Sequence, residues 1–226
     1  MWVKICANTN LADALLVVEA GADAVGFVFA ESKRRVTVAQ VARITSGLPE
    51  SVEKVGVFTT RNAAEILTIA QISGLTTVQV HSDFDPSLVG ALKGNGLRVL
   101  QVLDVPVGGG AESERELETA LRAVLREAAV DAVLLDASVK GVSGGTGVAF
   151  DWKGISTVVQ RVYDEAGEGA PKLIVAGGLR PENVAAAIEA FAPWGVDVAS
   201  GVEASPGVKD GVKVRAFVGN ARAAGR

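Results

Sequence analysis

The sequence predicts a single-domain α/β protein, a (β/α)8 TIM barrel in which eight parallel strands are surrounded by eight helices. Three observations predict this fold. Short β-branched runs alternate with Ala-, Leu- and Glu-rich stretches, at roughly one pair per 25–30 residues. Eight such pairs fit into the 226 residues, which is close to the usual size of this barrel. The strand-like runs are apolar on both faces, as buried parallel strands must be, and a doubly wound open sheet is the competing architecture.

The two kinds of segment follow one another along the whole chain. Short phrases at residues 21–23, 130–132 and 195–197 stand where one helix would end and the next strand begin. Two of these phrases start with Gly, which is common just past a helix end. Strands are expected near residues 2–6, 24–29, 52–58, 77–80, 97–102, 132–135, 172–175 and 196–199. Helices are expected near residues 11–20, 38–46, 63–72, 87–92, 112–128, 152–165, 182–191 and 209–223.

Composition argues against several other classes of protein. Hydrophobic residues make up 49% of the chain and charged residues 21%, which is enough for a core and too apolar for disorder. No linker or charge block divides the chain, so one domain over residues 1–226 is expected. No apolar run reaches the ~18 residues of a membrane span, and no signal-type segment is evident. The net charge of −4 argues against nucleic acid as a partner.

The single cysteine cannot form an internal disulfide. With the single histidine, it also cannot build a zinc cage of thiolates and imidazoles. We therefore expect a cytoplasmic enzyme that uses no metal and has no membrane partner.

In a barrel of this kind, the active face is formed by the carboxyl ends of the strands and the loops after them. Side chains alternate along a strand, so residues two apart point to the same side. We expect the polar members of these pairs to face the barrel axis. The polar residues at strand ends and in the following loops are Cys6, Arg34, Gln79, His81, Asp104, Asp136 and Asp197. The pairs that share a face are Lys4 with Cys6, Gln79 with His81, Leu134 with Asp136, and Asp197 with Ala199.

Two glycine turns indicate a phosphate site. Gly177 and Gly178 follow the seventh expected strand, and Ser200 and Gly201 follow the eighth. Gly lets backbone N–H groups approach an anion closely, and a helix that begins there adds the positive end of its dipole. Either turn alone is also explained as a helix cap. Together they stand where barrels commonly hold phosphate, so we expect a phosphorylated ligand.

Cys6 and Asp136 are candidates for an acid–base pair. A free thiol has a pKa near ~8.5, so substantial thiolate at neutral pH needs a positive neighbour, which Lys4 can supply. Most lone cysteines, however, are small buried hydrophobes, and from the residues alone this is the favoured explanation of Cys6. Asp136 follows an apolar run, so its carboxylate needs a partner or a task. A helix N-cap or an ion pair with Lys140 is the structural alternative.

Two further side chains have both a structural and a functional interpretation. Arg34 lies in the charged run 31–35, and it is either surface charge or a clamp for a substrate carboxylate. His81 is either a satisfied structural histidine or part of the site.

The ordered set of motifs resembles the phosphoribosylanthranilate isomerase family of tryptophan biosynthesis over essentially the whole chain. A single Gly-rich motif would be unspecific, whereas the ordered set is highly specific. The matching segments are residues 3–6, 26–29 with Ser32 and Arg34, 55–58, 78–81, 134–136, 144–147, 150–152, 176–179, 181–184, 196–198, 200–203, 206–207 and 209–210.

The resemblance implies the Amadori rearrangement of N-(5-phosphoribosyl)anthranilate by general acid–base catalysis, without a cofactor. By this likeness Asp136 is the general acid, Cys6 is the general base, and Arg34 holds the anthranilate carboxylate. The substrate is a small phosphosugar, and the protein is a monomer or a homodimer. The further substrate-binding residues that the resemblance implies are Gly177, Gly178, Ser200 and Gly201 for the phosphate, and Gln79, His81 and Asp197 in supporting roles.

Three positions depart from the family pattern. Ala7 stands where the family usually has Gly, Lys33 replaces a common Pro, and Ser82 replaces a Gly. Ala7 adds a methyl group near the substrate, and Lys33 frees the loop that carries Arg34. We expect a raised KM with the chemical step retained.

Two other interpretations of the function compete with the isomerase resemblance. A phosphosugar isomerase of the histidine-pathway type generally has an aspartate where Cys6 stands. A non-catalytic phosphate-binding barrel would not need Cys6, Asp136 and Arg34 together.

Overall fold

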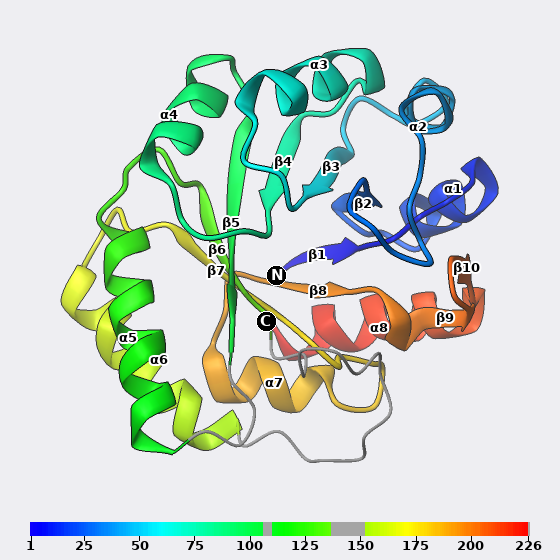
Figure 1. The fold of residues 1–226 in the computed structure, drawn as a ribbon. Helices are drawn as coiled ribbons and strands as arrows, with labels where there is room; N and C mark the ends of the chain where they lie inside the picture. The colour runs from blue at the N-terminus through cyan, green and yellow to red at the C-terminus, as the bar shows by residue number, and fades with distance from the viewer. Residues whose placement is uncertain (106–109, 137–151, 226) are drawn as a thin grey trace.

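The computed structural model describes residues 1–105, 110–136 and 152–225. Eight strands form a closed barrel in which each strand pairs with the next in sequence and β8 pairs with β1, all in parallel. The helices surround it (Figure 1). The predicted barrel is confirmed, and the open sheet is excluded. The strands are β1 Trp2–Ile5, β2 Ala24–Val28, β3 Glu53–Phe58, β4 Thr77–Val80, β5 Arg98–Asp104, β6 Ala132–Asp136, β7 Lys172–Ala176 and β8 Gly195–Val198.

The helices begin and end within about three residues of the expected positions. Polar N-caps explain several starts: Asn10, Thr37 and Asp210 each accept a hydrogen bond from the first turn of the helix that follows. The helix expected from residue 182 begins at 184, because the Asn183 side chain instead accepts from the backbone of Arg180 in a turn. The helices are α1 Leu11–Glu19, α2 Val38–Thr45, α3 Ala63–Ser73, α4 Pro86–Gly94, α5 Ala111–Leu125, α6 Trp152–Ala166, α7 Val184–Phe191 and α8 Gly211–Ala224.

The core has two layers separated by the barrel wall. The inner layer fills the barrel with side chains from alternating strand positions, among them Val55, Leu100, Leu134 and Ile174. The outer layer lies between strands and helices and includes Leu135, the sequence neighbour of Leu134. This arrangement confirms the predicted alternation, since residues on one parity face the axis and those on the other face the helices.

A short hairpin between β8 and α8 was not predicted. The 3-10 helix η1 (Ser200–Val202) leads into β9 (Glu203–Ser205), which pairs antiparallel with β10 (Val208–Lys209). The pairing sets Lys209 opposite Glu203. The last helix therefore begins at Gly211, two residues after the expected start, because residues 208–209 belong to the hairpin.

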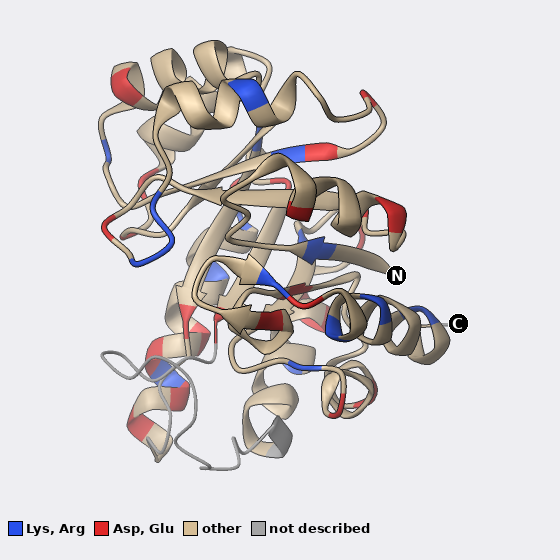
Figure 2. Cartoon of the chain, turned by 90° about the vertical axis from the view of Figure 1, so that its right-hand side faces the viewer, with Lys and Arg blue, Asp and Glu red and all other residues tan. Residues whose placement is uncertain are grey.

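Charge is spread over the outside of the molecule. Figure 2 shows basic and acidic segments interspersed along the helices and loops of one side of the barrel. None of the helices within the described ranges is long and apolar enough to cross a membrane.

Candidate active site

A buried charged cluster lies inside the barrel below the end of β1. Lys4 is fully buried, and its ammonium donates to Oδ2 of Asp197, on the adjacent β8, at 2.8 Å. The positive charge of Lys4 also acts on the thiol of Cys6, the residue directly after β1. The remaining carboxylate oxygen of Asp197, Oδ1, is buried without a hydrogen-bond partner in the described part of the chain. The predicted shared face of Lys4 and Cys6 thus carries one connected polar cluster.

The ionisation of Cys6 is set by opposing effects. Burial raises the pKa of the thiol, the positive charge of Lys4 lowers it, and the negative charge of Asp197 raises it again. The net result is a pKa above the ordinary value. Lys4 supplies the positive influence expected from the sequence, yet burial outweighs it. The pKa of Lys4 is itself raised, since the attraction of Asp197 and Cys6 exceeds the desolvation that opposes it.

Asp136 ends β6 on the inner side of the barrel. It lies two residues after Leu134, which belongs to the inner layer, so its side chain points toward the axis. Asp136 is half-buried, and its charge acts on Asp197. In the closed parallel barrel β7 and β8 lie between β6 and β1, so Asp136 and Cys6 stand at the same end of the barrel, two strands apart. The alternative ion-pair partner, Lys140, lies outside the described residues.

Arg34, in the loop after β2, is held by a carboxylate. Its Nε donates to both carboxylate oxygens of Glu203, at 2.9 and 3.0 Å, and its Nη2 donates to Oε2 at 2.7 Å. The Arg34 side chain is only 20% exposed, so it is not plain surface charge. Glu203 in turn contacts Lys209, whose ammonium also donates to the backbone oxygen of Cys6 at 2.6 Å.

Sequence reasoning assigned no role to Glu203 or Lys209. Both stand inside matched family segments, but neither residue alone signals a function. Only the hairpin register brings them opposite one another, and a separation of six positions does not predict that register.

The two glycine turns pack against each other. Gly177 and Gly178 have φ values of +84° and +63°, which favour glycine. A Cβ at Gly201 would overlap the carbonyl oxygen of Leu179, so the loop after β8 touches the backbone of the loop after β7. The Asn183 amide donates to the Gly178 oxygen and steadies the first loop. The structure thus brings the predicted phosphate turns together.

Gln79 and His81 differ in their surroundings. Gln79 is buried, and its Oε1 has no hydrogen-bond partner among the residues that the structure describes. His81 Nε2 lies 2.9 Å from Oδ1 of Asp104, and both side chains are about a third exposed. His81 therefore stands at the rim with a carboxylate partner, while Gln79 lies deeper in the barrel.

The three departures from the family pattern fall near this face. Ala7 has a φ of +61° and is 1% exposed, so a residue with a side chain occupies left-handed backbone directly after Cys6. Lys33 is exposed, as expected for a solvated loop residue. The Ser82 hydroxyl is buried, and nothing within the described ranges pairs with it.

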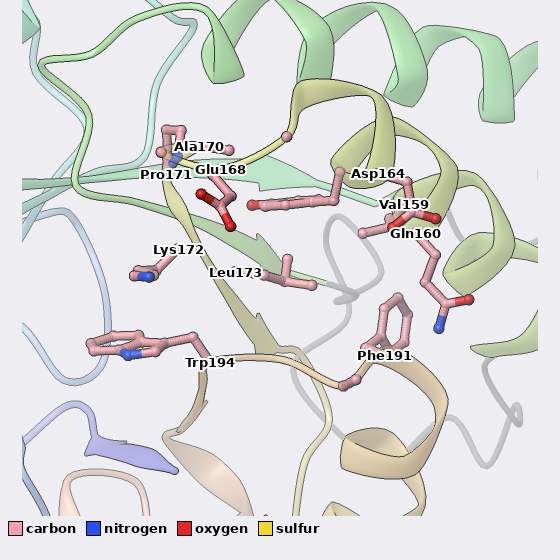
Figure 3. Close-up of a pocket in the computed structure, with 14 residues that line it drawn as sticks. Val159, Gln160, Asp164, Glu168, Ala170, Pro171, Lys172, Leu173, Phe191 and Trp194 are labelled. Carbon is pink, nitrogen blue, oxygen red and sulfur yellow. The ribbon is translucent and has the colours of Figure 1, made fainter.

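A cavity of about 540 Å³ lies at the other end of the barrel. It is bounded by α6, the start of β7 and the segment before β8, with Tyr163, Lys172, Phe191 and Trp194 among its lining (Figure 3). None of the predicted site residues lines it. Among the described residues, no three His, Cys, Asp or Glu side chains gather as metal ligands.

Comparison with known proteins agrees with this arrangement. A family model described as N-(5'-phosphoribosyl)anthranilate (PRA) isomerase matches residues 3–220. The N-(5'-phosphoribosyl)anthranilate isomerase of Rubrobacter xylanophilus is 42% identical over 97% of this chain and 98% of its own length.

Solved structures give the same result. The phosphoribosyl anthranilate isomerase of Thermotoga maritima superposes with a TM-score of 0.83 at 37% identity, covering 99% of both chains. A phosphoribosyl anthranilate isomerase in complex with reduced 1-(o-carboxyphenylamino)-1-deoxyribulose 5-phosphate gives 0.80 at 36%, also over 99% of both chains. The predicted resemblance is confirmed, and the chain belongs to the N-(5'-phosphoribosyl)anthranilate isomerase family.

Proposed function

We propose that this protein catalyses the Amadori rearrangement of N-(5-phosphoribosyl)anthranilate to 1-(2-carboxyphenylamino)-1-deoxyribulose 5-phosphate, a step of tryptophan biosynthesis. The proposal is supported above all by one observation: Cys6 and Asp136 stand at the carboxyl ends of two different strands, at the same end of a barrel of this family. An aldose–ketose isomerisation of this kind needs an acid and a base that flank the sugar, each within hydrogen-bond reach of its proton.

Asp136 acts as the general acid in the first step. It donates its proton to the ring oxygen of the furanose while the bond from that oxygen to carbon 1 breaks. The nitrogen lone pair forms the C=N bond, so the ring opens to a protonated Schiff base. Asp136 suits this role because it points into the barrel from the end of β6.

Cys6 acts as the general base in the second step. Its thiolate removes the proton from carbon 2, whose electrons form a C=C bond to carbon 1 while the C=N electrons return to nitrogen. The enolamine then tautomerises to the ketone. The buried Lys4 ammonium stabilises the thiolate by its positive charge. A proton transfer of this kind typically contributes 10²–10⁴-fold to the rate.

The two anionic ends of the substrate are anchored apart. Arg34 binds the carboxylate, while the turns at Gly177–Gly178 and Ser200–Gly201 bind the phosphate through backbone N–H groups. Fixing both ends holds carbon 2 and the ring oxygen near their catalytic groups, an effect that can supply about 7–11 kcal/mol. Gln79, His81 and Asp197 support the sugar, and Gln79 Oε1, which no described residue pairs with, suits a sugar hydroxyl.

Turnover of the substrate, followed by the loss of anthranilate fluorescence, tests the proposal. We expect Cys6→Ser and Asp136→Asn to reduce kcat by at least about 100-fold, on the magnitude of general acid–base catalysis. Asp131→Asn is the matched control, because Asp131 precedes the same strand at its opposite end, where it pairs with Lys93. We expect it to keep kcat within about threefold, since it is remote from the chemistry.

A wild-type protein without turnover, which also fails to rescue a tryptophan auxotroph lacking this step, would refute the function. Near-full activity of Cys6→Ser or Asp136→Asn would refute the role of that residue. The single-domain organisation, the cytoplasmic location and the monomeric or homodimeric state remain part of the proposal; the unpaired Cys6 fits a reducing compartment.

A further inference from the structure

Glu203 and Lys209 are buried charges placed between groups that the proposed function uses. Their side chains are 4% and 0% exposed, and their N–O distance is 3.3 Å. They face one another across the β9–β10 hairpin. Burying a charge is costly unless it is paired and hydrogen-bonded. The cost of breaking this pair therefore holds the two side chains in place.

Lys209 ties Glu203 to the ends of two strands. Besides the carboxylate, its ammonium donates to the backbone oxygen of Cys6 at 2.6 Å and to that of Ala199 at 3.4 Å. Glu203 Oε1 also accepts from the backbone N–H of Gly207, at 3.2 Å. The carboxylate is therefore held by two groups of its own hairpin, and Lys209 also connects that hairpin to the backbone just after β1 and β8.

Arg34 is bound on one edge only. Glu203 occupies the edge formed by Nε and Nη2, whereas Nη1 donates no hydrogen bond to the part of the chain that the structure describes. Burial favours the neutral form of Glu203, but Arg34 and Lys209 outweigh it and hold the pKa of the carboxyl below its usual range. Glu203 thus remains a carboxylate, and Nη1 of Arg34 is left without a hydrogen-bond partner among the described residues.

We propose that Glu203 is a positioning residue, which orients Arg34 so that its Nη1–Nη2 edge receives the carboxylate of the substrate. The inference rests on the proposed function, because it takes Arg34 as the carboxylate anchor. A guanidinium offers two edges for bidentate binding, and Glu203 takes one of them. Because Glu203 follows the Ser200–Gly201 turn after one intervening residue, it also couples the carboxylate anchor to the phosphate loop.

The test compares two substrates on one preparation of Glu203→Gln. The second substrate is N-(5-phosphoribosyl)aniline, which lacks the carboxylate. The amide nitrogen of Gln cannot accept from Arg34, so the guanidinium loses its fixed orientation. We expect kcat/KM for the carboxylated substrate to fall about 10–100-fold, mainly through KM, since misplacement by about 1 Å can cost about 100-fold. For the aniline substrate we expect a change below about threefold on the same reasoning.

The ratio of the two losses does not depend on the fraction of folded protein. Glu203→Asp, whose side chain is one methylene shorter and draws the carboxylate back from the Arg34 donors, is a second variant with the same expected ratio. Glu53→Gln is the matched control, because Glu53 is a largely buried carboxylate that binds Arg98 at 2.7 Å at the start of β3. It is expected to leave the ratio unchanged.

A double variant tests the same inference independently. Adding Glu203→Gln to Arg34→Ala should cost nothing further, because Glu203 acts through Arg34. Equal losses for both substrates, or additive losses in the double variant, would overturn the inference. A wild type that turns over neither substrate would instead refute the proposed function. In that event, calorimetry with reduced 1-(o-carboxyphenylamino)-1-deoxyribulose 5-phosphate decides the inference, which requires at least a tenfold loss of affinity in Glu203→Gln.

Discussion

The thiol of Cys6 and the ammonium of Lys4 share one buried space, and their interaction decides how the proposed base is ionised. Lys4 favours the thiolate, while burial and Asp197 favour the thiol. A raised pKa makes the thiolate a stronger base and reduces the fraction present at neutral pH. Cys6 is thus a strong base, but only a small fraction of it is thiolate at neutral pH.

This balance predicts a pH profile for Cys6. Because the pKa in the folded protein is above that of a free thiol, reaction with iodoacetamide should still increase above about pH 8.5, where a free thiol is half ionised. Mass spectrometry gives the rate unambiguously, since Cys6 is the only cysteine of the chain. Glutathione in the same buffers is the reference. A midpoint for Cys6 below that of glutathione would contradict the prediction.

Ala7 carries a conformational cost beside the base. An L-residue in the left-handed region costs about 1–2 kcal/mol, which Gly would avoid. Ala7→Gly also removes a buried methyl group worth about 0.8 kcal/mol and adds chain entropy. We expect these effects to cancel, so that the free energy of unfolding changes by less than about 1 kcal/mol, and we expect KM to fall.

Ala24→Gly is the control for this change. Ala24 is likewise buried, but it lies in β2 and has no left-handed strain to relieve. Its replacement should lower the free energy of unfolding by about 1–2 kcal/mol, from the lost methyl and added chain entropy. Urea unfolding measures both variants. An equal loss in the two would show that the φ of Ala7 stores no strain.

At the scale of elements, alternation along the strands predicted most of the inner face. It placed Lys4, Leu134 and Asp197 correctly, because a side-chain period of two is fixed by the backbone. The strand boundaries also followed from β-branched runs, to within about two residues. Periodicity predicts which way a side chain points, and this was enough to place the strand residues of the candidate site.

Periodicity could not predict which charges pair. The contact of Arg34 with Glu203 joins residues 169 positions apart, and it depends on the loop after β2 reaching the hairpin after β8. The hairpin itself has strands of three and two residues, too short for a detectable pattern. The ion pairs of Glu203 with Arg34 and Lys209 could therefore be identified only from the structure.

The contact between the two glycine turns predicts the effect of Gly201→Ala. The added methyl would overlap the Leu179 oxygen, so the loops must move apart. We expect a loss of about 1–3 kcal/mol in the free energy of unfolding, as for overpacking. Affinity for inorganic phosphate, measured by calorimetry, should fall as well.

Gly219→Ala serves as the control for Gly201→Ala. Gly219 lies in α8 with open space around its Cα. Its replacement should stabilise the protein by about 1 kcal/mol through helix propensity and leave phosphate binding unchanged. If Gly201→Ala bound phosphate like the parent, the packed turns would not form the phosphate site.

At the scale of the whole molecule, the two ends of the barrel have different tasks. The carboxyl ends of the strands carry Cys6, Asp136 and the glycine turns. At the amino ends, the rings of Trp2 and Trp194 stack with centroids 5.1 Å apart and close the inner apolar layer. In barrels of this kind, the carboxyl ends of the strands carry the active site, and the amino ends contribute mainly to stability.

Trp2→Ala tests this division. Trp2 begins β1, the strand that Cys6 follows, so damage transmitted along the strand would reach the proposed base. Truncation of a large aromatic side chain in a core costs about 3–5 kcal/mol, and we expect the lower value because Trp2 is only half-buried. Below the shifted unfolding transition, kcat and KM should stay within about twofold, because the rigid wall of parallel strands holds the other end in place. Urea unfolding and steady-state kinetics on the same sample measure the two effects, and a large loss of kcat in fully folded protein would show that the two ends are coupled.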